Sequence, residues 1–332
     1  MDKLWCGIDV SAKQLAVAVQ DDSGRIQQRS FENNRSGHGV LLRWLQRSAR
    51  PIEACLEATG VYSVDVALAL HAAGIRVGVL NPKIVCRFSE TLGRTKTDPV
   101  AAMVLSEYAR RMPWHVWVPP SPTAMALRAI TRHWATVTKE HTMQRNRLHA
   151  AESCAVTPRC VTQDLKRSLR LLEASAERLR REALRLVASD EPLSSRFQLL
   201  LTIPGIGETS GLQLLGELMM LPADMDVRQW VAHSGLDPVH HTSGSSVEKR
   251  PHISRAGNRH LRRALFMPAL VGVYRDPHLG AFYRQLLARD KRKLQALLAV
   301  ARKLLHAIFG MFRHHQAYDG QRLFPQLAVA VP

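Results

Sequence analysis

No stretch of about 18 uncharged apolar residues occurs in the sequence, which excludes the long apolar helix that crosses a membrane. The first ten residues, MDKLWCGIDV, also lack the apolar core of a secretion signal. We therefore expect a soluble cytoplasmic protein with no membrane partner.

The sequence also lacks the cysteine patterns of zinc sites and disulfide frameworks. Its five cysteines are scattered, and none belongs to a C-x-x-C pair. The histidine pairs His240-His241 and His314-His315 are adjacent in sequence, and adjacent side chains point apart on a regular element. We expect no structural zinc, and we interpret the cysteines as small core or surface residues.

Acidic and aromatic residues are scarce. The 46 Lys and Arg residues outnumber 28 Asp and Glu residues and give a net charge of +18, which indicates a polyanionic partner. Aromatic residues make up only 6% of the chain, which disfavours stacking platforms as the main device for recognising single strands. Apolar residues reach 46%, enough to form a core and to exclude a disordered or fibrous chain.

The first 82 residues alternate short apolar strands with helices. Three strands come first, and a helix, a strand, a helix and a strand follow them. This order predicts an α/β sheet with mixed strand directions, as in a ribonuclease-H-like fold. The expected strands cover residues 5–10, 14–20, 25–31, 52–58 and 75–82, and the expected helices lie around residues 40–45 and 66–74.

Between Pro122 and Asp190 the sequence contains no glycine and is helical in pattern, with one break near residues 156–158. We predict two long helices that form an antiparallel hairpin or a dimerisation arm. Their charged outer faces are either solvated surface or a nucleic-acid contact. In the second helix, apolar residues recur in steps of four and three, the pattern of a coiled-coil seam: Val161, Leu165, Leu169, Leu172, Ala176, Leu179, Ala183 and Leu186.

A mostly helical C-terminal part follows, in which Pro204-Gly205-Ile206-Gly207 separates two apolar runs. This turn resembles a helix-hairpin-helix element, whose backbone N–H groups at Gly205 and Gly207 would bind a phosphate. An ordinary helix connection uses the same residue types, so both interpretations stay open. The predicted domains are 1–115 for the ribonuclease-H-like part, 116–192 for the arm and 193–332 for the C-terminal domain.

Three carboxylates fall where strands end or a helix begins. Asp9 and Glu57 lie near strand ends, and Asp98 follows the basic run 93–97. Parallel strands that end on the same side bring their last residues together, and carboxylate oxygens suit Mg²⁺. Each residue also has a simpler interpretation: Asp9 as a turn residue, Glu57 as a solvated strand end, and Asp98 as a helix cap before Pro99. Taken together, the three favour a metal nuclease site.

Two groups of motifs resemble those of the insertion-sequence transposases of the one-ten/eleven-eleven type, in the family's order and over nearly the whole chain. The first group is GIDVSAK around Asp9, LEATGVY around Glu57 and NPKIVCRFSETLGRTKTDPVAA around Asp98. The second is GLDPVHHTSGSSVEKRPHISRAGNRHLRRAL. The resemblance implies a RuvC-like domain with a four-carboxylate (DEDD) site for Mg²⁺ or Mn²⁺, followed by a transposase domain with a nucleophilic serine.

The sequence departs from the family pattern at Ala101, where family members are expected to carry the fourth aspartate. Residues three apart share a helix face, so an aspartate there would lie beside Asp98. Either this copy is natively inactivated, or the alanine was introduced to trap an uncleaved complex, or another acid substitutes. We favour inactivation.

The resemblance assigns the nucleophile to Ser243, with Ser245 and Ser246 as alternatives. A hydroxyl that attacks phosphorus forms a covalent phosphoserine link and so conserves the bond for rejoining. The basic residues around these motifs are expected to bind phosphates: Lys96, Lys249, Arg250, Arg255, Arg259, Arg262 and Arg263.

The resemblance further implies donor and target DNA as partners, a noncoding bridge or seeker RNA as guide, and a dimeric or tetrameric assembly associated with the nucleoid. We predict a recombinase in which the metal carboxylates and Ser243 form a composite site. One alternative is a RuvC-like Holliday-junction nuclease that uses water. Another is a catalytically inactive nucleic-acid-binding regulator, which Ala101 suggests.

Overall fold

The computed structural model describes residues 3–48, 50–58, 60–92, 97–243, 247–254 and 256–324, and it leaves the side chains of residues 240–251 undescribed. The chain forms two compact units, residues 1–119 and residues 120–332. The helical arm belongs to the second unit, together with the C-terminal helices. The finer division at residues 115 and 192 stays a prediction.

The first unit is built on a five-stranded mixed sheet with the strand order β3-β2-β1-β4-β5. The strands are β1 (Leu4–Val10), β2 (Gln14–Gln20), β3 (Ile26–Glu32), β4 (Ile52–Glu57) and β5 (Arg76–Leu80). The pairs β1–β2 and β2–β3 are antiparallel, whereas β1–β4 and β4–β5 are parallel. The structure therefore has the mixed sheet that the sequence predicts, with the strand order and directions of a ribonuclease-H-like fold.

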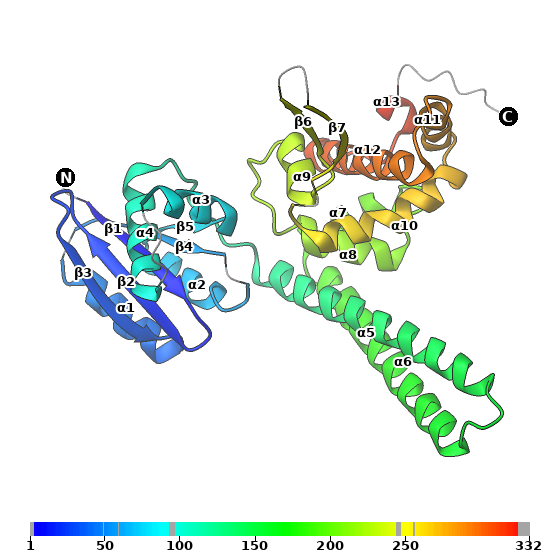
Figure 1. Ribbon diagram of the computed structural model, residues 1–332, viewed down its shortest axis with the longest axis horizontal. Coiled ribbons are helices and arrows are strands. Elements are labelled where there is room, and N and C mark those ends of the chain that lie inside the picture. Colours follow the sequence, from blue (N-terminus) through cyan, green and yellow to red (C-terminus); the bar gives the residue numbers. More distant parts are fainter. Residues whose placement is uncertain are drawn as a thin grey trace. The chain divides into compact units, whose positions relative to one another are not determined.

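Helices cover both faces of this sheet (Figure 1). On one face, α1 (Arg35–Gln46) and α2 (Val64–Ala72) bury their apolar residues against Ile8 and Leu56. On the other face, α3 (Pro82–Leu92) and α4 (Asp98–Arg111) pack over Cys55 and Leu80. Because both faces are covered, the central strands are apolar almost throughout, which is typical of parallel pairs.

The second unit begins with two long helices, α5 (Pro122–Glu152) and α6 (Arg159–Ala188), which lie side by side (Figure 1). Two cross-helix ion pairs, His141–Glu173 at 3.0 Å and Lys166–Glu152 at 2.8 Å, show that the helices run antiparallel. The predicted seam positions of α6 are buried or half-buried, except for the exposed Val161. The helical hairpin is thus present, and its coiled-coil character and its role in assembly stay predictions.

The rest of the second unit is mostly helical, as the sequence predicts, but a two-stranded hairpin interrupts it. The polar sequences of this hairpin, PVHHTS and VEKRPHI, lack the apolar alternation that signals a strand, and the sequence analysis predicts no strand there. The elements are α7 (Glu191–Leu201), α8 (Glu208–Leu218), α9 (Val227–Ser234), β6 (Pro238–Ser243), β7 (Val247–Ile253), α10 (Arg259–Arg275), α11 (Pro277–Ala288), α12 (Lys293–His314) and α13 (Gly320–Leu323).

Within the described residues, one helix, α12, has the length and composition of a membrane span. It also buries Leu304, Leu305 and Ile308 in the core of the second unit. Such burial is typical of the central helix of a folded domain.

All five cysteines are free thiols. Cys6 and Cys55 are core residues of the sheet, and burial raises the pKa of the Cys55 thiol to about 12. Cys86, Cys154 and Cys160 are exposed. This distribution agrees with their interpretation as small core and surface residues.

Candidate active site

Asp9 and Glu57 lie at the same level on neighbouring parallel strands. In the register of β1 and β4, Gly7 pairs with Cys55 and Ile8 pairs with Leu56, so Asp9 and Glu57 follow together. Side chains alternate along a strand, and both carboxylates therefore belong to the face that α4 covers. Each side chain is half-buried.

The middle of α4 crosses β1 at Gly7, two residues before Asp9. A Cβ atom on Gly7 would lie 2.1 Å from the carbonyl oxygen of Ala102 and 2.2 Å from the backbone nitrogen of Ser106. Such close approach of a helix backbone to a strand requires a glycine. Gly7 therefore determines how near the first turns of α4 lie to the strand that carries Asp9. The glycine of GIDVSAK does not by itself signal this role, because the role depends on a contact with a helix that lies about 95 residues later in the chain.

Asp98 and Ala101 lie in the first turn of α4. Asp98 is the first residue of the helix and is exposed, and Ala101 is half-buried with its backbone N–H donating to the carbonyl of Thr97 at 2.8 Å. Ala101 immediately precedes Ala102, whose carbonyl lies against Gly7. The position of the missing aspartate is thus next to the segment of α4, Ala102 to Ser106, that contacts β1. Lys96 lies outside the described residues.

The carboxylates at the ends of β1 and β4 are suited to binding a hard divalent cation. Asp9 and Glu57 offer carboxylate oxygens from adjacent strand ends, and Mg²⁺ and Mn²⁺ prefer oxygen ligands. Ala101 offers no ligand. Among the residues that the structure describes, no group of three or more His, Cys, Asp or Glu side chains is arranged to hold a metal ion.

Ser243 is the last residue of β6, where it pairs with Val247 of β7. Its side chain is not among those described, and Ser245 and Ser246 lie outside the described residues. The backbone places Ser243 at the end of β6, next to the turn of the β6–β7 hairpin.

The base of this hairpin is held by two sets of hydrogen bonds. The Ser254 hydroxyl donates to the Asp237 carboxylate, and the Ser254 backbone N–H donates to the Asp237 carbonyl at 2.9 Å. Further along, the backbone N–H of Asn258 donates to the carbonyl of His233 at 2.6 Å. Gly257 makes this approach possible, since a Cβ there would lie 2.2 Å from the same carbonyl oxygen.

Asn258 also connects the hairpin to a buried carboxylate. Its amide donates to Glu217 at 2.6 Å, and Arg132 of α5 donates twice to Glu217, at 2.6 and 2.9 Å. Glu217 is only 2% exposed. Burial alone would raise its pKa, but the hydrogen bonds from Arg132 and Asn258 outweigh burial and hold the pKa below its ordinary value. Glu217 thus joins α5, α8 and the start of α10.

We expect Glu217→Gln to lower the free energy of unfolding by about 2 kcal/mol at neutral pH, because Arg132, whose side chain is half-buried, would keep its charge without its partner. A carboxylate with a lowered pKa adds stability above its ordinary value of 4.5 and loses it as the pH falls through the lower folded value. The variant should therefore lose less stability on acidification than the parent. Urea unfolding between about pH 6 and pH 3 measures both effects.

The matched control is Glu173→Gln, which removes a carboxylate that is 63% exposed in its pair with His141. An exposed pair contributes at most about 1 kcal/mol. Equal losses in the two variants would contradict the structural role of Glu217.

The predicted phosphate-binding turn packs against α10. Gly205 has a φ of +100°, and a Cβ there would lie 2.8 Å from the carbonyl oxygen of Pro268. Gly207 caps α8 and faces open space. Gly205 and Gly207 line an open hollow of about 360 Å³, and Arg275 lines it as well. Gly205 therefore has a packing role, and phosphate binding at this turn stays a prediction.

The predicted basic residues have different surroundings. Arg259 and Arg263 are exposed on α10, whereas Arg262 donates to the carbonyl of Ser234 at 2.7 Å. The side chains of Lys249 and Arg250 are not described, and Arg255 lies outside the described residues. Arg262 has a structural contact of its own, and the phosphate-binding role of the whole group stays a prediction.

Comparison with known proteins gives two family matches. Residues 6–151 match a family described as a DEDD transposase of the IS110 type, and residues 197–284 match one described as "Transposase IS116/IS110/IS902 family". The "Pilin gene-inverting protein" of Moraxella bovis is 29% identical over 96% of this chain and 98% of its own length. An uncharacterized 42 kDa protein of insertion element IS900 from Mycobacterium paratuberculosis is 35% identical over 39% of this chain and 34% of its own.

Among solved structures, the chain is similar to "T. thermophilus RuvC in complex with Holliday junction substrate". The identity is 13% and the TM-score is 0.28, over 35% of this chain and 99% of that one.

Proposed function

The chain belongs to the IS110 family of transposases, which are DNA recombinases, and from this premise we propose that it cuts and rejoins DNA with metal-binding carboxylates and a serine nucleophile. The observation that carries the proposal is that Asp9 and Glu57 occupy neighbouring positions on adjacent parallel strands, on the face of the sheet that α4 covers. Ser243, at the tip of the β6–β7 hairpin, would supply the nucleophile.

Asp9, Glu57 and Asp98 would hold Mg²⁺ or Mn²⁺. A bound divalent cation would supply charge neutralisation at the scissile phosphate. The half-buried position of Asp9 and Glu57 favours this role, because partial burial strengthens the attraction between carboxylates and a cation. Ala101 leaves the family's fourth ligand position without an oxygen, and we propose that this lowers or abolishes activity in this copy.

In the proposed chemistry, the Ser243 oxygen forms a bond to phosphorus while the bond from phosphorus to the departing deoxyribose oxygen breaks. The serine proton leaves to a base, and the released sugar hydroxyl takes up a proton. Attack by a sugar hydroxyl on the phosphoserine reverses these changes and restores the serine. The DNA is rejoined without an added energy source because the number of phosphodiester bonds is conserved.

Two features favour rejoining over simple hydrolysis. The name of the Moraxella bovis relative describes the inversion of a gene, and an inversion requires that cut ends be joined again. The second family match covers residues 197–284, which include Ser243. A RuvC-like nuclease that uses water would need no serine there.

Ser243→Ala separates these two functions. Because Ala101 is proposed to lower activity, Ser243→Ala is made together with Ala101→Asp. We expect it to lower the strand transfer of the Ala101→Asp chain by about 1000-fold or more, because nucleophilic catalysis has no substitute once the hydroxyl is gone. The assay follows joined products from a labelled DNA substrate and traps the covalent protein–DNA link on a denaturing gel. Ser245→Ala is the matched control and should keep both signals. Intact cleavage by Ser243→Ala would support the water-using nuclease.

We further propose DNA and a noncoding guide RNA as partners, with a dimer or tetramer in the cytoplasm as the working form. The +18 charge supports polyanion binding, and phosphate contacts alone carry no sequence information. Sequencing the nucleic acid that copurifies with the chain tests the guide: one defined noncoding RNA supports it, and random fragments contradict it. If the chain binds DNA but cleaves none in any metal, the inactive regulator is the better description.

A further inference from the structure

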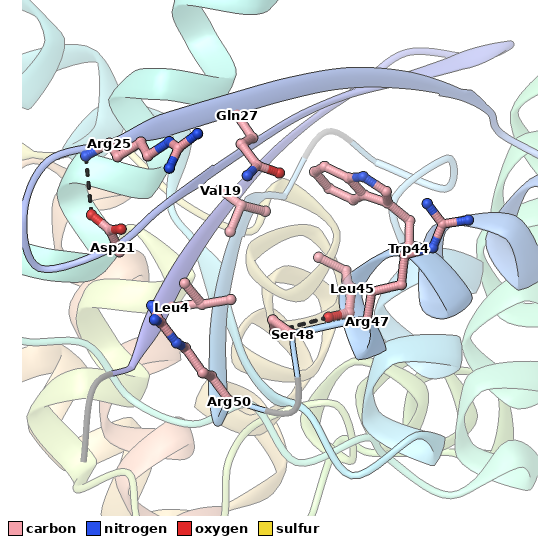
Figure 2. Close-up of a pocket in the computed structure, with 10 residues that line it drawn as sticks. All are labelled: Leu4, Val19, Asp21, Arg25, Gln27, Trp44, Leu45, Arg47, Ser48 and Arg50. Atoms are coloured by element: carbon pink, nitrogen blue, oxygen red, sulfur yellow. Dashed lines mark hydrogen bonds between the residues drawn. The ribbon is translucent and has the colours of Figure 1, made fainter.

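A second feature of the first unit lies at the other end of the sheet from the carboxylates. A hollow of about 450 Å³ opens between the beginning of β1, the end of β2 and the last turn of α1 (Figure 2). Leu4 at its edge is five residues before Asp9 on β1, which corresponds to roughly 16 Å along the strand. The hollow is therefore separate from the carboxylate edge.

Three arginines line this hollow, and they come from two different segments. Arg25 belongs to the turn between β2 and β3, and Arg47 and Arg50 follow the end of α1. In Figure 2, Arg25 and Arg50 lie on one side of the hollow, and Arg47 lies on the other. All three are exposed. In the part of this unit that the structure describes, Glu53 forms ion pairs with Lys3 and Arg76, and Glu107 forms ion pairs with Arg110 and Arg111. These ion pairs do not involve the three arginines of the hollow.

The hollow contains one carboxylate, Asp21, and its own turn engages it. Asp21 accepts hydrogen bonds from the backbone N–H and the hydroxyl of Ser23 and from the backbone N–H of Arg25. These bonds, led by the one from the Ser23 hydroxyl, hold the pKa of Asp21 below its ordinary value, and the positive charge of Arg50 contributes in the same direction. Asp21 thus shapes the turn that carries Arg25. With three arginines and one aspartate, the lining has a net charge of 3 − 1 = +2.

An aromatic wall completes the hollow. Trp44 is half-buried and packs against Phe31 with a centroid distance of 5.5 Å, so the ring is held in place. Leu4, Val19 and Leu45 provide an apolar lining beside it. A fixed indole beside apolar side chains offers a stacking surface to a planar ring, and base–aromatic stacking contributes about 1–3 kcal/mol per base.

Helix-end electrostatics explain only part of this arrangement. Arg47 and Arg50 lie just after the C-terminus of α1, where positive charges are favourable. That effect does not account for Arg25, which comes from a strand turn, or for an indole beside an open hollow. Guanidinium groups bind phosphate oxygens in a bidentate manner, and a duplex keeps its base faces stacked and unavailable. The combination fits one unpaired nucleotide.

We propose that this hollow binds an unpaired nucleotide of a nucleic-acid strand, with its base against Trp44 and its phosphates on Arg25, Arg47 and Arg50. The volume lies in the range of pockets that hold small ligands, roughly 300–1,000 Å³. The site goes beyond the proposed strand exchange, because it is remote from the carboxylates and needs neither metal nor Ser243. It would hold a displaced or single-stranded segment on the first unit.

The first test compares two double variants that each remove two positive charges near α1. The double variant Arg47→Gln, Arg50→Gln alters the lining of the hollow. The double variant Arg35→Gln, Arg43→Gln alters exposed residues of α1 that do not line the hollow. Binding of labelled 12-nucleotide oligothymidine and oligouridine to the full chain is measured in EDTA, so the result is independent of cleavage. The DNA and RNA arms identify which strand the site prefers.

We expect the hollow variant to bind at least one oligonucleotide about tenfold more weakly and to lose about 1.4 from the slope of log affinity against log salt, since each phosphate contact on a single strand contributes about 0.7. The matched variant should stay within about twofold of the parent. Thermal unfolding verifies that both variants are folded. Equal affinities in the two variants would overturn the proposal.

The second test locates the base directly. Oligonucleotides that carry 5-iodouracil are photocrosslinked to the unmodified chain, and the linked peptide is identified by mass spectrometry. We expect the crosslink at Trp44. Crosslinks confined to other residues would overturn the proposal even if the arginine variants bind weakly.

Discussion

Ala101→Asp is expected to raise Mg²⁺-dependent strand cleavage by about 100-fold or more, because a cation at a reacting phosphate contributes several kcal/mol and each 1.36 kcal/mol changes a rate tenfold. The added carboxylate would lie about one turn after Asp98, immediately before Ala102, whose carbonyl lies against Gly7 of β1. Cleavage of labelled DNA in Mg²⁺, Mn²⁺ and EDTA, in the presence of the copurified nucleic acid, measures the effect.

The matched control is Met103→Asp, which adds the same charge to α4 two residues later, away from the Asp98 face of the helix. It should leave cleavage at the parent's level. Unchanged cleavage in Ala101→Asp would count against the four-carboxylate assignment. An equal gain in cleavage in both variants would show that the added negative charge acts wherever it lies on α4, and not as a metal ligand at position 101.

Gly7→Ala is expected to lower the free energy of unfolding of the first unit by about 3 kcal/mol or more. The new methyl group would overlap the backbone of α4, at 2.1 Å from the Ala102 oxygen, and backbone atoms cannot turn aside as a side chain can. Relief requires α4 to move away from β1 and to carry Asp98 with it. Urea unfolding, followed by the circular dichroism of the full chain, gives the loss.

Gly39→Ala is the control for this substitution. Gly39 lies within α1, and a Cβ there would meet only the Arg43 guanidinium at 3.6 Å, an ordinary contact. Alanine in a helix is more favourable than glycine by up to about 1 kcal/mol. We therefore expect Gly39→Ala to be neutral or stabilising. A similar loss in both variants would mean that the close approach at Gly7 is not what limits the packing of α4.

The sheet of the first unit could be predicted because its strands are short, apolar and separated by clear turns. Asp21 to Gly24 marked the turn into β3, and the alternation of helix and strand after it indicated parallel pairing. Helix α3, at Pro82–Leu92, was not predicted. The β6–β7 hairpin escaped prediction because its residues are polar and its strands form a sheet of only two.

The candidate site was predictable only where it depends on strand order. Asp9 and Glu57 lie near the ends of two adjacent parallel strands, β1 and β4. Their neighbouring positions follow from the parallel register of these strands. The roles of Gly7 and Glu217 depend on contacts between segments far apart in sequence, and the sequence alone gave no signal of either. Ser243 was assigned by resemblance alone, and the structure adds its place at the tip of a hairpin.

The bond between Arg132 and Glu217 has a mechanical consequence. Helix α5 has 31 residues, so it is a rod of roughly 46 Å at 1.5 Å per residue. Arg132 lies about a third of the way along this helix, and the part from Arg132 to Glu152 extends roughly 30 Å beyond the Arg132–Glu217 contact. The same carboxylate holds Asn258 at the base of the serine hairpin. Movement of the arm is thus resisted by this carboxylate together with the close contact of Thr131 and Arg128 with Gly216 of α8.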